Sequence, residues 1–364
     1  MRKGAQNGGN FMQVVATKSG LTRDIAIDAT RGIVILLVVL FHVTRGFVSA
    51  GWLPDSYALN FADTFTYGFH VQTFLLISGY LAYPRAGQAH FQLQRQVWLY
   101  HAYLLWSLIS WVLIATMSNA VNNPLDLRDL LLIPIVPIQH FWFLLCLMLG
   151  IALLAVLRTP WALIGGGIAL ILLANALGGL PSPLGQLDAV CMVLVGAWLR
   201  ATDLKPRANL PIALLCLAFM GLCTWWKING TPGYAYPDPT LPFALSGSYA
   251  AYSFGTLAGR SGIIGSVLAY LGQHSLVIYL THVIAGSGLR VILMQVTPGL
   301  NLYVALALVI GASVAAPLIF EKIAQWMGLA KLFALRPIIG DRARPAAVEA
   351  APVVLAPSGA PSDR

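Results

Sequence analysis

Two ionisable residues lie eleven positions apart at the start of the first long apolar run of the chain, Arg31 before it and His42 within it. At about 100° per residue, eleven steps amount to roughly three turns plus 20°, so both side chains lie on one helix face. His42 follows Gly32 by about 15 Å at 1.5 Å per residue, which is close to the middle of a bilayer core. Ionisable groups at that depth are costly and are candidate functional groups. The alignment predicts a ligand path from the membrane edge to His42.

Each of these residues also has a purely structural interpretation. Arg31 could be a positively charged anchor on the cytoplasmic side, and His42 could form a hydrogen bond between helices. Asp28, one turn before Arg31, could hold the guanidinium in place or be an ordinary interfacial carboxylate. The shared face favours a ligand path over either structural role taken alone.

The composition is typical of a membrane protein. Of the 364 residues, 58% are hydrophobic and 10% are charged, and the mean hydropathy is +0.76, whereas about a quarter of the residues of a soluble domain are charged. Apolar runs near the roughly 20 residues needed to cross a bilayer recur along the chain. We therefore expect an all-α transmembrane helix bundle in a single membrane domain, residues 23–340. The polar segment 1–22 and the Ala/Pro-rich tail 341–364 are predicted to be disordered.

Ten transmembrane spans are predicted, at residues 32–50, 63–83, 97–117, 140–157, 161–177, 184–199, 210–228, 241–259, 263–286 and 302–319. Pro134 and Pro137 interrupt the apolar run before His140, so that piece is expected to be re-entrant or interfacial. When the spans alternate in direction, all but four of the 22 Lys and Arg residues fall on the side that holds both termini. Basic residues gather on the cytoplasmic side of membrane proteins. Both termini are therefore predicted to be cytoplasmic.

Several classes of function are disfavoured by the same features. The excess of 22 Lys and Arg over 13 Asp and Glu follows the membrane topology, so no nucleic-acid partner is expected. The four cysteines lie in apolar runs, which argues against a disulfide framework. The three histidines at membrane depth lack both carboxylate partners and regular spacing, so no metal site is expected. The first apolar run leads into further membrane segments and is predicted to be a retained span.

The chain resembles the acyltransferase-3 membrane family in a series of motifs that occur in the family's order. The segment from Asp28 to His42 is similar to its first helix, whose hallmark is an arginine, ten residues and a histidine. Four further matches are FLLISGY at 74–80 with the following Arg95, HFWFL at 140–144, SLVIYLTH at 275–282, and the pair Glu321–Lys322. Each motif is short, but five in order are much more specific.

The resemblance implies transfer of an acyl group, expected to be acetyl, from cytoplasmic acyl-CoA to a hydroxyl of a cell-surface or lipid-linked glycan. The protein would be a multi-pass enzyme of the plasma (inner) membrane, with acyl-CoA as a substrate and no tightly bound cofactor. The resemblance also implies that His42, Arg31 and Asp28 are catalytic-site residues. Arg31 would pair with the donor phosphates. His42 would act either as a general base or as the carrier of a transient acyl group.

The resemblance implies two further groups of residues. Donor-binding candidates beside Arg31 are Arg95, Ser78, Gly79 and Tyr80, and acceptor-side candidates are His140, Trp142, Tyr279 and His282. Close helix packing is the alternative role for the segment 78–80, and a position in the aromatic belt is the alternative for Trp142.

A different class of function stays open from the sequence. In a proton-coupled transporter or flippase of glycans or small polar solutes, buried histidines would relay protons without covalent chemistry. Such a protein would move solute without consuming acyl-CoA. A membrane sensor ranks last, because no soluble domain is attached that would deliver a signal.

Overall fold

A computed structural model of the chain describes residues 24–116, 125–177, 184–230, 240–297 and 299–337. The two terminal segments that are predicted to be disordered, 1–22 and 341–364, lie outside these residues. All regular structure in the described residues is helical, which confirms the all-α prediction. The α-helices are α1 (Ile25–Ser49), α2 (Tyr57–Tyr67), α3 (His70–Ala82), α4 (Ala89–Thr116), α5 (Leu127–Leu132), α6 (Trp142–Leu153), α7 (Pro160–Ala176), α8 (Leu187–Ala201), α9 (Leu210–Asn229), α10 (Thr240–Gly259), α11 (Gly262–Gln273), α12 (Ser275–Val296) and α13 (Leu302–Trp326). Three short 3-10 helices are η1 (Tyr83–Arg85), η2 (Gln139–Phe141) and η3 (Leu184–Gln186).

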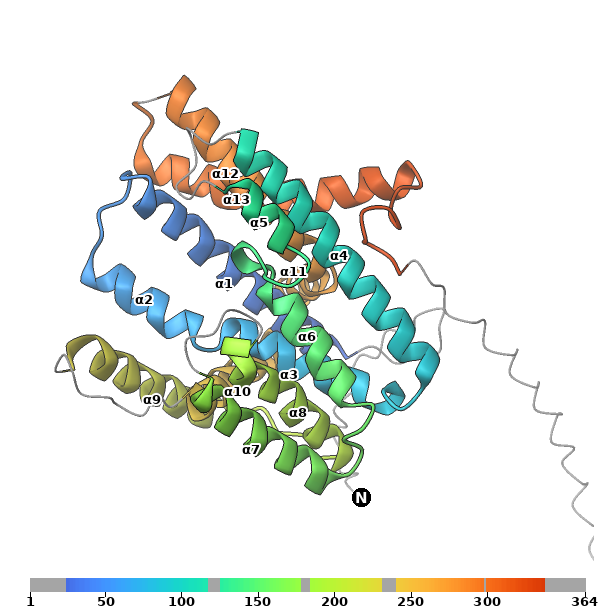
Figure 1. Cartoon of the computed structure of the whole chain (residues 1–364). Helices are drawn as coiled ribbons and strands as arrows, with labels where there is room; N and C mark the ends of the chain where they lie inside the picture. The colour runs from blue at the N-terminus through green and yellow to red at the C-terminus, as the bar shows by residue number, and fades with distance from the viewer. Residues whose placement is uncertain (1–23, 117–124, 178–183, 231–239, 298, 338–364) are drawn as a thin grey trace, which may run out of the picture.

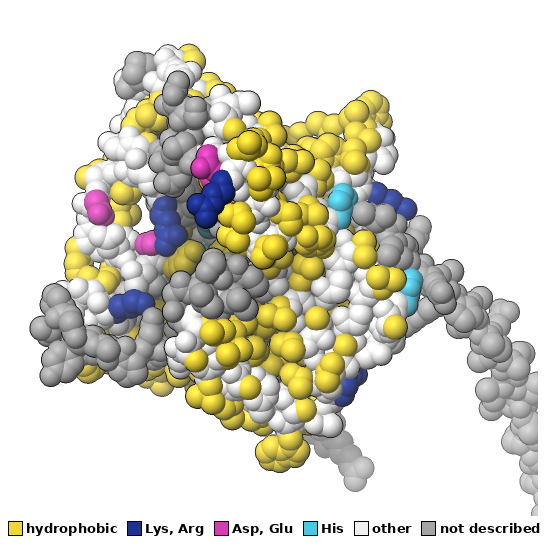
Figure 2. Space-filling model, viewed as in Figure 1, with side chains coloured by type: hydrophobic (Ala, Val, Ile, Leu, Met, Phe, Trp, Pro, Cys, Tyr) yellow, Lys and Arg dark blue, Asp and Glu magenta, His cyan; other side chains and the backbone are white. Residues whose placement is uncertain are grey.

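Five of these helices are long and apolar enough to cross a membrane, namely α1, α4, α9, α12 and α13. Shorter apolar helices cover Gln139–Leu153, Pro160–Ala176 and Gly262–Gln273. Large apolar side chains stay on the outside, for example Trp161, Ile263 and Trp326, which are more than 80% exposed. Figure 2 shows hydrophobic side chains spread over the visible face and few charged ones. An apolar exterior of this kind suits a lipid environment. The count of ten spans and the side of the termini stay predictions.

Helix α1 runs through the middle of the bundle (Figure 1), in contact with α3, α10, α11, α12 and α13. It begins where the Asp24 carboxylate accepts hydrogen bonds from the backbone N–H groups of Ala26 and Ile27, at 2.9 and 3.3 Å. Such a cap satisfies donors that have no partner within the helix. Because most of its neighbours are helices from the C-terminal half of the chain, α1 brings its polar residues against them.

Two glycines allow α1 and α11 to approach to backbone contact. A Cβ atom on Gly32 would lie 2.0 Å from the carbonyl oxygen of Leu268, and one on Gly272 would lie 1.8 Å from that of Asp28. Side chains at these positions would force the helices apart, and small residues are the usual means of close helix packing in membranes. The contact fixes the start of α1 beside the junction of α11 and α12.

The structure corrects two of the predicted spans, because each corresponds to two helices. The span predicted at 263–286 is interrupted at His274, which separates α11 from α12. Gln273 and His274 at this break bond to Asp28 of α1 and Glu321 of α13, so tertiary partners stabilise a break within a run that carries no formal charge. The span predicted at 63–83 divides into α2 and α3 at Gly68, where Phe243 packs against the backbone.

The proline-rich segment before His140 is interrupted as the sequence predicts. Only six residues form α5, and the chain turns through Pro134 and Pro137 before η2 and α6 begin. Proline removes a backbone donor and clashes with the preceding turn, so a continuous helix cannot form here. As a result His140 lies in η2, just before α6, and not within a long helix.

Candidate active site

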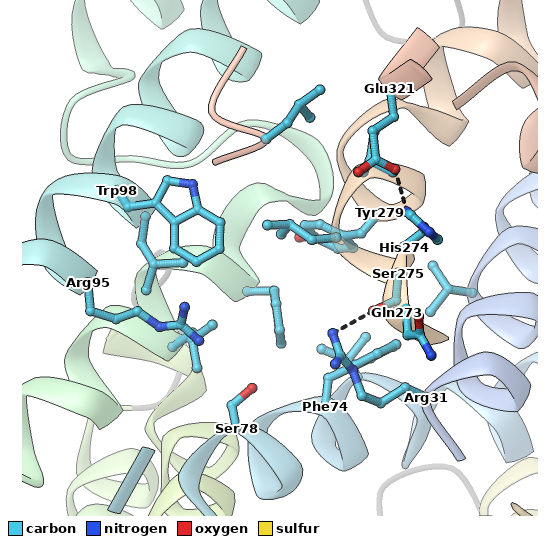
Figure 3. A pocket seen from close by; sticks show the side chains of 18 residues that line it. Arg31, Phe74, Ser78, Arg95, Trp98, Gln273, His274, Ser275, Tyr279 and Glu321 are labelled. Atoms are coloured by element: carbon cyan, nitrogen blue, oxygen red, sulfur yellow. Dashed lines mark hydrogen bonds and ion pairs between the residues drawn. The ribbon is translucent and has the colours of Figure 1, made fainter. Parts of the chain in front are cut away.

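A cavity of about 220 Å³ lies beside the start of α1, and we call it the arginine cavity. Its walls come from α1, α3, α4, α6, α12, α13 and the break between α11 and α12. Arg31 and Arg95 point into it from opposite sides, with Ser78 between them on a third side (Figure 3). Two guanidinium groups facing one cavity favour an anionic ligand, because guanidinium donors match phosphate and carboxylate oxygens.

Arg31 is held by neighbours on two helices. Its Nη2 donates to the Ser275 hydroxyl at 2.9 Å, and its Nη1 lies 3.9 Å from the Asp28 carboxylate. Gln273 donates to the other oxygen of Asp28 at 3.3 Å. These contacts join α1 to the start of α12 and orient the guanidinium toward the cavity. Asp28 is only 5% exposed, so its contact with the Arg31 guanidinium is shielded from solvent.

Arg95 reaches the cavity from α4. Its guanidinium lies 4.9 Å from the centre of the Trp98 ring, in the range of a cation–π contact. Its Nε atom is buried and has no hydrogen-bond partner among the described residues. A buried donor without a partner is costly, so this group is well placed to bind a ligand oxygen.

A histidine–carboxylate pair borders the same cavity. The Nδ1 atom of His274 lies 2.5 Å from a carboxylate oxygen of Glu321, and Gln325 donates to the other oxygen at 3.0 Å. This pair ties the break before α12 to α13 (Figure 3). It also gives the wall of the cavity a negatively charged group opposite Arg95.

Three histidines from different helices meet deeper in the bundle, and we call them the histidine cluster: His42 of α1, His140 of η2 and His282 of α12. The ring centroids are 5.0 Å apart for His42 and His282, 5.2 Å for His140 and His282, and 5.7 Å for His42 and His140. His140 and His282 are buried, at 8% and 1% exposed. The sequence separates these residues by about a hundred positions or more, so only the fold brings them together.

Backbone carbonyls fix the tautomer of each ring in the cluster. Nδ1 of His42 bonds to the carbonyl of Val38 at 2.9 Å, and Nδ1 of His282 bonds to those of Ile278 and Tyr279 at 2.9 Å each. A carbonyl only accepts, so these nitrogens carry the proton in a neutral ring and Nε2 is the basic atom. In His140 the roles are reversed, since Nε2 donates to the Tyr279 carbonyl at 3.1 Å. Each ring keeps one basic nitrogen.

Tyr279 and Val38 connect the arginine cavity to the histidine cluster. Both residues line the cavity, and their carbonyls are the ones that hold the three imidazoles. The Tyr279 hydroxyl also donates to the carbonyl of His140. Gln139, just before His140, has a φ of 51°, a left-handed conformation that non-glycine residues rarely adopt. Residues that position the three imidazoles therefore line the cavity, whereas the imidazoles themselves are not among its lining residues.

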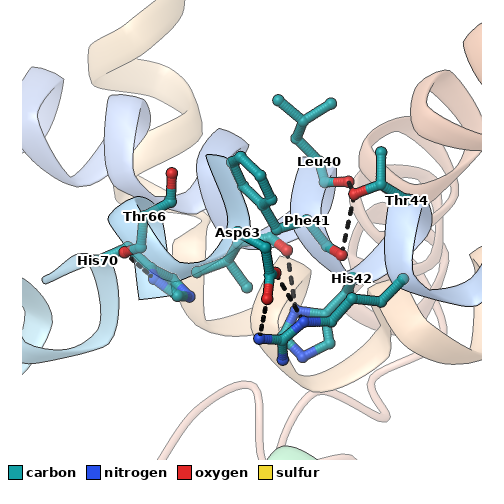
Figure 4. A network of polar contacts seen from close by, with 9 residues as sticks. Leu40, Phe41, His42, Thr44, Asp63, Thr66 and His70 are labelled. Atoms are coloured by element: carbon teal, nitrogen blue, oxygen red, sulfur yellow. Dashed lines mark hydrogen bonds and ion pairs between the residues drawn. The ribbon is translucent and has the colours of Figure 1, made fainter. Parts of the chain in front are cut away.

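A separate polar network lies one turn beyond His42 on α1 (Figure 4). Arg45 forms two hydrogen bonds with Asp63 of α2, at 2.7 and 2.6 Å, and its guanidinium stacks on Tyr67 at 4.2 Å. The Tyr67 ring in turn packs against that of His70, 5.4 Å away. The cluster thus lies between the arginine cavity and a second set of polar residues.

Several of the predicted site residues lie outside the arginine cavity. A Cβ atom on Gly79 would lie 1.9 Å from the Val193 carbonyl, so this glycine packs α3 against α8. Tyr80 stacks under Arg200, at 5.5 Å, and Trp142 packs against the hydrophobic core. Arg31, Arg95, Ser78 and Tyr279 do line the cavity.

Sequence reasoning missed Gln273, His274 and Trp98 as site residues, although all three line the cavity. The signal for the first two was the polar pair itself, which interrupts an otherwise apolar run. Trp98 follows Arg95 by three residues, which is the spacing of neighbours on one helix face. Among the described residues, no group of three His, Cys, Asp or Glu side chains has the arrangement of a metal site.

These features define a multi-pass membrane protein with a buried polar site. A family model described as an acyltransferase domain, that of the acyltransferase-3 family, matches residues 24–321. The match spans well over half of the 364 residues, so the chain belongs to the acyltransferase-3 family, as the motifs predict. No curated protein and no solved structure matches the chain.

Proposed function

We propose that this membrane acyltransferase moves an acetyl group from acyl-CoA to a hydroxyl of a cell-surface or lipid-linked glycan. The observation that carries the proposal is the path from Arg31 and Arg95, through the arginine cavity, to the residues that hold His42. Acyl-CoA fits such a path, because a long neutral arm separates its charged phosphates from its reacting thioester. The phosphates could bind Arg31 and Arg95 while the thioester lies near His42.

The arginine end of the cavity is where the phosphates of coenzyme A would bind. Arg31 and Arg95 supply the cationic donors, and Ser78 is a further polar group on the wall. Apolar side chains such as Phe74 and Leu147 line the rest and would contact the pantetheine arm. The cavity is small compared with the several hundred Å³ of most ligand sites, so the nucleotide end of the donor would stay outside it.

His42 would act as the general base. Its Nε2 takes the proton of the acceptor hydroxyl while the hydroxyl oxygen bonds to the thioester carbonyl carbon. The carbon–sulfur bond then breaks, and the proton on Nε2 passes to the departing thiolate. The hydrogen bond from Nδ1 to Val38 holds the tautomer that this step requires. Transfer through an acyl group on Nε2 uses the same atom and stays the second chemical route.

The membrane placement belongs to the same proposal. Ten spans with both termini in the cytoplasm would place Arg31 on the side where acyl-CoA is made. The network of Arg45, Asp63 and Tyr67 would then face the opposite side, where a glycan acceptor would approach His42. The plasma (inner) membrane is the expected location for the modification of a cell-surface glycan.

Labelled membranes provide the test. Membranes that contain wild-type protein are incubated with radiolabelled acetyl-CoA, and the glycan and lipid fractions are counted. We expect label in one of these fractions, and we expect His42→Ala membranes to lack it. Solute uptake by the wild-type membranes without loss of acetyl-CoA would favour a proton-coupled transporter or flippase instead.

A further inference from the structure

His282 is buried beside the proposed base and has a basic nitrogen that nothing satisfies. Its Nδ1 proton is shared between the carbonyls of Ile278 and Tyr279, which leaves a lone pair on Nε2. That atom is buried and has no hydrogen-bond partner among the described residues. The ring lies edge-on to that of His42, with a centroid distance of 5.0 Å and an interplanar angle of 83°. An unsatisfied buried acceptor is costly to keep, which indicates a state in which a donor faces it.

The reaction at His42 creates such a donor. In the resting protein His42 and His282 both present a lone pair on Nε2, so neither can donate to the other. When His42 takes the proton of the acceptor hydroxyl, its Nε2 becomes a charged N–H group. A charged donor forms a hydrogen bond roughly twice as strong as a neutral one. This state of the reaction supplies a donor for the free nitrogen of His282.

We propose that His282 stabilises the protonated form of His42 during acyl transfer, by accepting part of a three-centre hydrogen bond that the Nε2–H group of His42 shares between His282 and the departing thiolate. The inference rests on the proposed function, because it requires His42 to act as the base. The proton stays on His42 and leaves with the thiolate, so His282 undergoes no net change. His282 is thus a positioning residue that acts through His42. An interaction made only after proton transfer raises kcat and leaves substrate binding unchanged.

His140 completes the arrangement from the third side. Its Nε2 is committed to the carbonyl of Tyr279, and its own carbonyl accepts from the hydroxyl of the same residue. This exchange holds η2 against α12 and keeps the His140 ring 5.2 Å from that of His282. The cluster is therefore preorganised, which is the condition under which such electrostatic contacts act most strongly.

The test compares kcat and KM for radiolabelled acetyl-CoA in membranes that contain the full chain, with initial rates normalised to folded protein. We expect His282→Leu to lower kcat about 10- to 100-fold, the loss of one hydrogen bond to a charged group, while KM stays near the wild-type value. The matched control is His101→Leu. His101 of α4 also has a buried ring nitrogen, Nδ1, with no hydrogen-bond partner among the described residues, but it belongs neither to the lining of the arginine cavity nor to the histidine cluster. We expect this control to keep its kcat.

Two further variants cover the case in which His282→Leu does not fold. His282→Gln places an oxygen near the position of Nε2, and His282→Asn places one near that of Nδ1, so the proposal predicts the higher kcat for Gln. A wild-type kcat in His282→Leu, a change in KM alone, or Asn matching Gln would overturn it. A zinc content of wild-type protein that His282→Leu abolishes would also overturn it, in favour of a metal site. Activity retained by His42→Ala would instead sink the proposed function itself.

Discussion

Tyr279 and His140 exchange hydrogen bonds across the bundle, the tyrosine hydroxyl donating to the His140 carbonyl and His140 Nε2 donating to the Tyr279 carbonyl. Tyr279 lines the arginine cavity, and His140 belongs to the histidine cluster. The pair therefore makes the wall of the cavity and the support of the cluster one structural unit. We expect a substitution of either residue to alter the position of the His42 imidazole.

Removing the Tyr279 hydroxyl tests this connection. We expect Tyr279→Phe to lower the free energy of unfolding by about 0.5–1.5 kcal/mol, the net value of one hydrogen bond, and also to lower kcat, because His140 and the cluster loosen. The control is Tyr103→Phe. Tyr103 is also buried and donates to the Ile133 carbonyl, so Tyr103→Phe should lower the stability with little change in kcat. Equal kcat values for the two variants would contradict the connection.

Arg31 is expected to contribute to donor binding. Arg31→Ala removes a charge-assisted contact worth about 1.5–3 kcal/mol, so KM for acetyl-CoA should rise roughly 10- to 100-fold. Arg31→Lys should restore donor binding only in part, since lysine lacks the planar guanidinium group that can donate two parallel hydrogen bonds. Arg260, an exposed arginine at the end of the α10 segment, provides the control in Arg260→Ala. Equal KM values for Arg31→Ala and Arg260→Ala would mean that Arg31 is only a positively charged anchor at the membrane edge and does not bind the donor.

Gly79 is expected to act through packing. In Gly79→Ala the new Cβ atom would meet the Val193 carbonyl at 1.9 Å, so α3 and α8 must separate, at a cost of about 1–3 kcal/mol. Gly221 in α9 has open space around it, and Gly221→Ala should leave the protein as stable or up to about 1 kcal/mol more stable. Thermal unfolding in detergent measures both. If the Gly79→Ala protein is as stable as wild type, close packing does not explain this glycine, and Gly79 is again a candidate for donor binding.

The membrane topology can be tested with reporters. A fluorescent protein fused after residue 364 is expected to fluoresce in the cytoplasm, and alkaline phosphatase fused there is expected to be inactive. Phosphatase placed in the segment 50–56 between α1 and α2 should be active, because that segment is predicted to lie outside. An active phosphatase at the C-terminus, together with an active one at 50–56, would mean an odd number of spans.

The sequence predicted that Arg31 and His42 share one face of α1, because helical periodicity is a local property. Arg31 and Val38, whose carbonyl bonds to His42, line the arginine cavity, whereas His42 is not among its lining residues, so the ligand path to His42 stays a prediction. The break at His274 could not be predicted from apolar run length, since it depends on Asp28 and Glu321, which are distant in sequence. The motifs named His140 and His282 as candidates, but their approach to His42 depends on tertiary packing.

The role of His42 as the base is the central claim, and the rate of acyl transfer by purified protein tests it most directly. With radiolabelled acetyl-CoA and the glycan fraction that takes up label, His42→Ala is predicted to lose about 10²- to 10⁴-fold in kcat, the usual contribution of general base catalysis. His101→Ala, which alters a histidine outside the arginine cavity and the histidine cluster, is expected to stay close to wild type. A His42→Ala enzyme that transfers acetyl groups as fast as wild type would contradict the account.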